Sequence, residues 1–214
     1  MPSPRRQHLL TVDEYLAREE REMCRNEYFD GQLFAMSGAT RRHNIISVNL
    51  HAFIHQHLKG RPCRAYISDV KVRVEATNSF YYPDIMVACD EFTIYTTSPV
   101  LIVEVLSRST AAIDRREKLF AYKQIPTLYE YLIVHQRKKR IEYHQKSSNG
   151  QWNVTTFGGG EFFTMLSEMG SPLTVAVDDI YEDVFTPESG NSSGARETVE
   201  NGYLEDLELE WLDW

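Results

Sequence analysis

The nine residues Pro99-Val-Leu-Ile-Val-Glu-Val-Leu-Ser107 decide the fold. They are apolar almost throughout and rich in β-branched side chains, which is the pattern of a strand buried on both faces of a sheet. Glu104 is the one charge in this strand, and a buried carboxylate is costly unless it binds a cation or a hydrogen-bond donor. The segment therefore predicts a central strand and a functional position on it.

Recognisable elements lie on both sides of this strand. Thr11-Val-Asp-Glu14 has the form of a capping box, which predicts a helix over 12–22, and Asp30-Gly31 favours a hairpin turn within 26–36. Helical spacing of apolar residues marks 42–58 and 111–124, and extended segments are expected at 66–74, 80–89, 128–134, 140–144 and 152–157. We therefore predict an α/β fold with a central mixed sheet flanked by helices, preceded by an N-terminal helix and β-hairpin.

Composition favours an ordinary soluble globular protein. The chain has 214 residues, of which 42% are hydrophobic and 25% charged. Its apolar runs fall far short of the roughly 20 residues of a membrane span, and its start leads into no signal-peptide core, so we expect a cytoplasmic protein with no membrane association. Three widely separated cysteines without a Cys-x-x-Cys pair argue against a disulfide framework and against a cysteine zinc site.

The net charge of −8 is concentrated near the C-terminus. Residues 188–214 hold eight acidic side chains and one arginine, which leaves residues 1–187 with a net charge of only −1. We therefore predict a domain over 1–186, whose near-neutral charge does not exclude binding to nucleic acid, followed by a flexible acidic tail over 187–214. The apolar residues interleaved with the tail's acids also allow it to dock on a partner or to occupy a basic cleft as a polyanion mimic.

Three residues could carry chemistry. Asp84 follows Pro83 and precedes Glu104 by 20 positions, and two carboxylates on neighbouring strands can share a Mg²⁺ or Mn²⁺ ion. Water bound to such an ion becomes a nucleophile near neutral pH. Lys118 shares a helix face with Asp114 and Tyr122, and it would orient the water or stabilise negative charge in the transition state if that helix packs over Glu104.

This pattern resembles the Uma2 family of the PD-(D/E)xK superfamily of restriction-endonuclease-like nucleases, in the form common in cyanobacterial genomes. The resemblance runs from about Leu10 to Phe185. Its motifs are Asn26-Glu-Tyr-Phe-Asp-Gly-Gln-Leu33, Arg42-His43-Asn44, Ser68-Asp69-Val70, Pro83-Asp84, Glu104-Val-Leu-Ser107, Asp114 to Tyr122, and Ile125-Pro126.

The resemblance implies roles for individual residues. Asp84 and Glu104 would be the metal ligands and Lys118 the catalytic lysine, supplied by the helix because the superfamily's usual lysine position is Leu106 here. Glu27 and His43 would line the same cleft. A second departure is Arg108, where relatives commonly carry proline; Arg108 would contact a phosphate or face solvent.

Several residues keep two interpretations. Glu104 could form a buried ion pair with Lys118 or Arg116 and bind no metal, and Lys118 could serve only as a helix partner of Asp114. Asp69 alternates with valines, so it is a cleft residue or a solvent-facing one. Arg42 and Arg115, with their neighbours, lie at the ends of the expected cleft helices, where they would contact a nucleic-acid backbone.

The predicted function is Mg²⁺- or Mn²⁺-dependent endonucleolytic hydrolysis of phosphodiester bonds, with DNA as the expected partner. By analogy the products would be a 5′-phosphate and a 3′-hydroxyl, and a homodimer would suit an enzyme that cuts both strands. Two alternatives remain open. One is a catalytically inactive nuclease-like module that binds nucleic acid or protein, and the other is a metal-dependent phosphoesterase acting on RNA or small phosphate esters.

Overall fold

The computed structural model describes residues 9–22, 24–36, 38–91, 93–107, 114–170 and 172–185. A six-stranded mixed sheet forms the centre, in the order β11-β10-β9-β8-β6-β3. Its strands are β3 (Arg64–Ile67), β6 (Ile85–Ala88), β8 (Pro99–Leu106), β9 (Glu130–His135), β10 (Arg140–Lys146) and β11 (Trp152–Gly158). The predicted central strand is β8, which runs antiparallel to β6 and parallel to β9.

One face of the central sheet is covered by a long helix and a small C-terminal unit. These elements are α2 (Arg41–Leu58), β12 (Phe162–Met165), η3 (Ser167–Met169), β13 (Leu173–Ala176) and α5 (Val177–Ile180). Ile46, Leu50 and Ile54 of α2 are fully buried against the odd-numbered side chains of β8. The apolar stripe of the sequence therefore packs where its helical spacing predicts, whereas β12, β13 and α5 carried no recognised signal.

The opposite face is covered largely by a second sheet, which adds to the predicted mixed sheet with flanking helices. This sheet has the order β2-β1-β5-β4-β7. Its strands are β1 (Asn26–Phe29), β2 (Gln32–Ala35), β4 (Lys71–Val74), β5 (Ser79–Tyr81) and β7 (Tyr95–Thr96), with η1 (Glu75–Thr77) between β4 and β5. Val72, Val74 and Tyr81 belong to the same buried cluster as the even-numbered side chains of β8.

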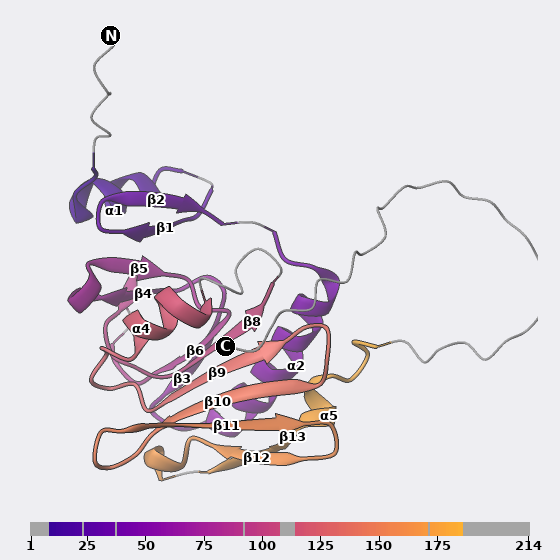
Figure 1. The fold of residues 1–214 in the computed structure, drawn as a ribbon. Coiled ribbons are helices and arrows are strands. Elements are labelled where there is room, and N and C mark those ends of the chain that lie inside the picture. Colours follow the sequence, from indigo (N-terminus) through magenta and orange to yellow (C-terminus); the bar gives the residue numbers. More distant parts are fainter. Residues whose placement is uncertain are drawn as a thin grey trace, which may run out of the picture.

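The predicted N-terminal helix and hairpin are confirmed. Helix α1 (Val12–Glu19) has the expected capping box between Thr11 and Glu14, and β1 and β2 pair antiparallel around Asp30-Gly31. Figure 1 shows these elements at one end of the molecule and β12 with β13 at the other. Tyr15 of α1 is buried with Tyr28 and Phe80, which attaches this helix to the second sheet.

Two segments predicted as single strands each cross between the sheets. Residues 66–74 divide at Ser68, whose φ of 52° turns the chain from β3 into β4. Residues 80–89 divide at 82–84, between β5 and β6. The Ser68 N–H donates to the Asp84 carbonyl at 3.0 Å, so the two crossings are bonded to each other. Asp84 therefore lies at a passage between sheets.

The second predicted helix, 111–124, is described only from Asp114 onward. There it forms a π-helical turn, η2 (Asp114–Lys118), followed by α4 (Leu119–Tyr122). Ala121 and Tyr122 are buried on the second-sheet side of the central sheet. Arg108, the predicted domain boundary after residue 186 and the acidic tail lie outside the described residues.

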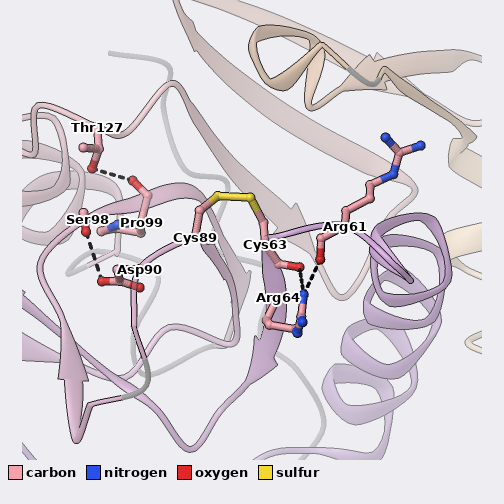
Figure 2. The surroundings of a disulfide bond; sticks show 8 residues. All are labelled: Arg61, Cys63, Arg64, Cys89, Asp90, Ser98, Pro99 and Thr127. Atoms are coloured by element: carbon pink, nitrogen blue, oxygen red, sulfur yellow. Dashed lines mark hydrogen bonds between the residues drawn. A yellow bond between two sulfur atoms is a disulfide. The ribbon is translucent and has the colours of Figure 1, made fainter.

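The prediction of no disulfide was wrong for two of the three cysteines. Antiparallel pairing places Arg64 opposite Ala88, so Cys63 and Cys89 are the next pair along these strands. Their sulfurs are bonded, with the two Cα atoms 4.0 Å apart (Figure 2), whereas Cys24 is free and exposed. Residues 26 positions apart became neighbours through strand pairing, which spacing alone does not reveal.

Within the described ranges, no helix has the length and hydrophobicity needed to cross a membrane.

Candidate active site

Asp84 is held at the start of β6 by contacts from two other elements. Its Oδ2 accepts a 2.7 Å hydrogen bond from the Val105 N–H of β8, and it lies 3.1 Å from Nε2 of His43. His43 is buried in the first turn of α2, where its N–H bonds to the side chain of the capping residue Thr40. The carboxylate is therefore fixed between a strand and a helix, with 17% of its side chain still exposed.

Glu104 lies beside Asp84 on the neighbouring strand. The register of β6 and β8 pairs Ile85 with Val103, which makes Asp84 and Glu104 the next opposed residues. Glu104 is only 3% exposed, and its Oε1 accepts hydrogen bonds from the Tyr122 hydroxyl at 2.9 Å and from the Lys118 ammonium at 3.3 Å. The two predicted acids are thus neighbours, as the motif requires.

Lys118 joins Glu104 to a third carboxylate. Its Nζ lies 2.9 Å from Oε1 of Glu27 on β1, and it is 5.7 Å from the ring centroid of Tyr81. Glu27 also accepts a 3.3 Å hydrogen bond from the Tyr82 N–H, two residues before Asp84. Because Lys118 is 5% exposed, its charge is screened little by water and acts strongly on both carboxylates.

Tyr122 serves the site as a neutral hydrogen-bond donor. Complete burial, with the Glu104 carboxylate next to it, raises the pKa of the Tyr122 hydroxyl well above its ordinary value. The hydroxyl therefore keeps its proton at physiological pH and donates a hydrogen bond to Glu104. The sequence places Tyr122 four residues after Lys118, on the same helix face, but the motifs assign it no role in the site.

The donor set suits a hard divalent cation. Glu27 and Glu104 both lie beside the Lys118 ammonium, and Asp84 is opposed to Glu104 across the pairing of β6 and β8. In the described part of the chain, no three His, Cys, Asp or Glu side chains are close enough together to form a complete metal cage. Mg²⁺ is usually held by only one or two carboxylates, with water and substrate phosphate completing its shell. Asp84 and Glu104 are the residues that could hold such an ion.

The remaining predicted residues lie away from this cluster. Asp69 is exposed and forms an ion pair with Arg25. Arg42 lies in the first turn of α2, with its guanidinium 5.6 Å from the ring centroid of Phe185. The exposure of Asp69 and its ion pair with Arg25 favour the solvent-facing interpretation of this residue.

Arg115 lies three residues before Lys118, beside a different carboxylate. Its Nη2 is 2.7 Å from Oε1 of Glu142 on β10. Its neighbour Arg116 is exposed, so it is not the buried partner that one interpretation of Glu104 had allowed.

Comparisons with known proteins show the family to which the chain belongs. Residues 12–176 match the model of the Uma2 family, described as putative restriction endonuclease. Two uncharacterized proteins of Synechocystis sp. are similar. One is 38% identical over 176 residues, covering 80% of this chain and 91% of its own length, and the other is 36% identical over 157 residues, covering 71% and 89%.

A solved structure shares the fold. It is the crystal structure of a putative nuclease belonging to DUF820 from Anabaena variabilis, which aligns with a TM-score of 0.68 at 15% identity and covers 82% of this chain and 99% of its own. This likeness confirms the restriction-endonuclease-like core that the motifs predicted. With the family model covering most of the domain, the chain belongs to the Uma2 family of nuclease-like proteins.

Proposed function

We propose that this protein is a Mg²⁺- or Mn²⁺-dependent endonuclease that hydrolyses phosphodiester bonds in DNA. The observation that carries the proposal is the adjacency of Asp84, just before β6, and Glu104 on β8, with the buried Lys118 ammonium 3.3 Å from Glu104. Two acids and a lysine in this arrangement are the elements of metal-assisted phosphodiester hydrolysis. Membership of a family described as putative restriction endonuclease supports the same reaction.

Each side chain has a defined task in this reaction. Asp84 and Glu104 would hold the metal, with a backbone carbonyl near Val105 as a further oxygen donor. The metal, when bound, supplies a water molecule of lowered pKa and offsets charge on the phosphate. Lys118 would orient the attacking water and stabilise negative charge that develops on the phosphate oxygens.

Four further groups hold this machinery in place. Glu27 fixes the Lys118 ammonium at 2.9 Å, and the Tyr122 hydroxyl fixes Glu104. The Val105 N–H and the His43 imidazole fix Asp84. Groups that orient the ligands of a metal typically change metal affinity or activity by about 10–100-fold when they are lost. We therefore assign them as positioning residues.

A second candidate function is supported by the same contacts. Lys118 lies between Glu27 and Glu104 and partly neutralises both, so the cluster could be a structural ion network in a domain that binds nucleic acid without cutting it. The two functions differ in metal binding. A purely structural network would not bind Mn²⁺ at a site that requires both Asp84 and Glu104.

The test is cleavage of supercoiled plasmid DNA in Mn²⁺ and in Mg²⁺ by the native chain and its variants. Lys118→Met is expected to lower the rate by about 10²–10³-fold, the usual effect of removing one group that stabilises transition-state charge. Asp84→Asn and Glu104→Gln should cause losses at least as large, because each removes a ligand charge. Asp69→Asn is the matched control, since Asp69 is an exposed carboxylate outside the cluster.

Two accompanying measurements separate the candidate functions. Circular dichroism checks that each variant folds, and calorimetric titration measures Mn²⁺ affinity directly. Binding of Mn²⁺ that Asp84→Asn abolishes, together with metal-dependent cutting, supports the nuclease. Native protein that binds DNA but neither binds Mn²⁺ nor cuts would refute the nuclease in favour of the binding module. Single-stranded DNA, RNA and small phosphate diesters complete the substrate panel.

A further inference from the structure

A second charged cluster lies close to the candidate active site on the same side of the central sheet. It consists of Arg115 on η2, His135 at the end of β9, and Arg140 and Glu142 on β10. Oε1 of Glu142 lies 2.7 Å from Arg115 Nη2, 3.0 Å from His135 Nε2 and 3.9 Å from Arg140 Nε. One carboxylate oxygen therefore faces two guanidinium groups and an imidazole.

The cluster has an excess of positive charge. A hydrogen bond from His135, together with the charges of Arg115 and Arg140, lowers the pKa of Glu142 to about 2, so this carboxylate is ionised. Its single negative charge faces two permanent positive charges. A structural ion pair needs one cation for one carboxylate, and the additional guanidinium leaves the cluster able to attract an anion.

Arg115 is held in a way that leaves part of its guanidinium available. Among the described residues, it contacts Glu142 and His135 through Nη2 alone, while 41% of its side chain stays exposed. An arginine carries five N–H donors in a planar fork, which suits two oxygens of one phosphate. Glu142 thus fixes one edge of the fork, and no group in the described part of the chain bonds to the donors on Nε and Nη1, which face a ligand.

The backbone around the cluster is also braced. The Tyr181 hydroxyl donates to the His135 carbonyl at 2.7 Å and contacts the Arg140 carbonyl at 2.9 Å, so the ends of β9 and β10 are held together. His135 pairs with Leu106 in the parallel register, two residues beyond Glu104 on β8. Ile133 of β9 is opposed to Glu104 on one side and to Glu142 on the other, so the carboxylates that hold Lys118 and Arg115 lie two strands apart, roughly 10 Å, on the same face of the sheet.

We infer that Arg115 and His135, held in place by Glu142, form a phosphate-binding subsite (the seat) for the phosphate next to the one that is cut. The seat rests on the proposed function, and it makes the substrate class a polynucleotide strand rather than a small phosphate ester. The reason is geometric: Arg115 and Lys118 are held by carboxylates two strands apart on one face of the sheet, so one phosphate does not contact both, whereas two phosphates of one strand span them. A substrate with a single phosphate occupies the catalytic cluster alone and gains nothing from the seat.

A substrate-length series tests the seat. The substrates are fluorescently labelled thymidine dimer and trimer, which carry one and two phosphodiester linkages, and kcat/KM is measured in Mn²⁺ for the native chain and two variants. Native protein is expected to gain about tenfold or more on going from dimer to trimer, the size of a charge-assisted contact. Arg115→Gln should lose this gain, as in a double-mutant cycle between the arginine and the phosphate.

Arg137→Gln is the matched control, because Arg137 is an exposed arginine in the turn between β9 and β10 and makes no contact in the cluster that the structure describes. It should keep the full gain. The seat is refuted if Arg115→Gln keeps the gain, or if it lowers kcat/KM equally for dimer and trimer, since the arginine would then serve the cut phosphate or only the fold.

Equilibrium binding separates failure of the seat from failure of the proposed function. If the native chain cuts no substrate, the nuclease proposal fails, and the seat is tested with labelled hexathymidine in Ca²⁺ by fluorescence anisotropy. Loss of one phosphate contact lowers the slope of log affinity against log salt by about 0.7 for a single strand. Arg115→Gln should show this reduced slope and Arg137→Gln the native slope; equal slopes in all three proteins would overturn the seat.

Discussion

Removing the Lys118 ammonium should reveal how strongly the buried cluster is coupled. Lys118 is 5% exposed and Glu104 3% exposed, with Nζ and Oε1 3.3 Å apart. Breaking a buried pair by removing one partner typically costs about 3–5 kcal/mol, because the remaining charge is left in a medium that solvates it poorly. Lys118→Met keeps the length of the side chain while removing the charge, so we expect a loss in this range.

The reciprocal variant should cost less. In Glu104→Gln, the Lys118 ammonium still has Glu27 at 2.9 Å, so its charge stays paired. We expect a loss of about 1–3 kcal/mol, the usual range for disturbing a buried hydrogen-bonded group. The double variant leaves neither charge at the 3.3 Å contact, and its loss should fall short of the sum of the two single losses by about 1–3 kcal/mol.

The assay is urea unfolding monitored by circular dichroism, without divalent metal, for the native chain and all three variants. For a chain of this size, the loss in Lys118→Met corresponds to a fall in Tm of roughly 6–20 °C. The exposed pair of Arg18 and Glu22, at 2.8 Å, provides a control cycle whose coupling should not exceed about 0.5 kcal/mol. Single losses below about 1 kcal/mol, or strict additivity in the buried cycle, would refute this reasoning.

Two further predictions concern stability. Burial lowers the pKa of His144 to about 4, and both its ring nitrogens lack a hydrogen-bond partner among the described residues. Since the ordinary pKa is 6.5, protonation favours the unfolded chain, and about 3 kcal/mol of stability present above pH 6.5 should be lost on acidification toward pH 4. Urea unfolding at pH 7.5 and 4.5 should show a smaller acid loss in His144→Leu than in the native chain; equal losses would contradict this assignment. The Cys63–Cys89 bond closes a loop of 26 residues, so replacing both cysteines by serine should cost about 3–4 kcal/mol through the entropy of the unfolded chain. Thiol titration in denaturant should find one free thiol in the native chain and three after reduction, and three thiols without reductant would show that the bond is absent.

Local patterns were sufficient for the elements whose signals lie close together in the sequence. The capping box at Thr11, the Asp30-Gly31 turn and the apolar stripe of α2 each depend on residues a few positions apart, and all three were predicted correctly. The crossings at Ser68 and at 82–84 were not predicted, because the alternating pattern of a strand is the same whichever sheet the strand joins. The second sheet was missed for the same reason.

The sequence by itself determined the chemistry of the candidate site: an acid after proline, a single acid in a buried apolar strand and a lysine on the following helix. Charged residues are unusual in apolar segments because an unpaired buried charge is costly. The three residues can therefore be recognised as candidate functional residues without a structure. Only the tertiary structure decided which groups meet. It placed Glu27 of β1 on Lys118 and His43 of α2 on Asp84, and it left Asp69 facing Arg25. It also joined Cys63 to Cys89 and gathered Arg115, His135 and Glu142. These contacts join residues 7 to 91 positions apart, and their partners are set by strand register and by how sheets and helices pack, which local sequence patterns do not encode.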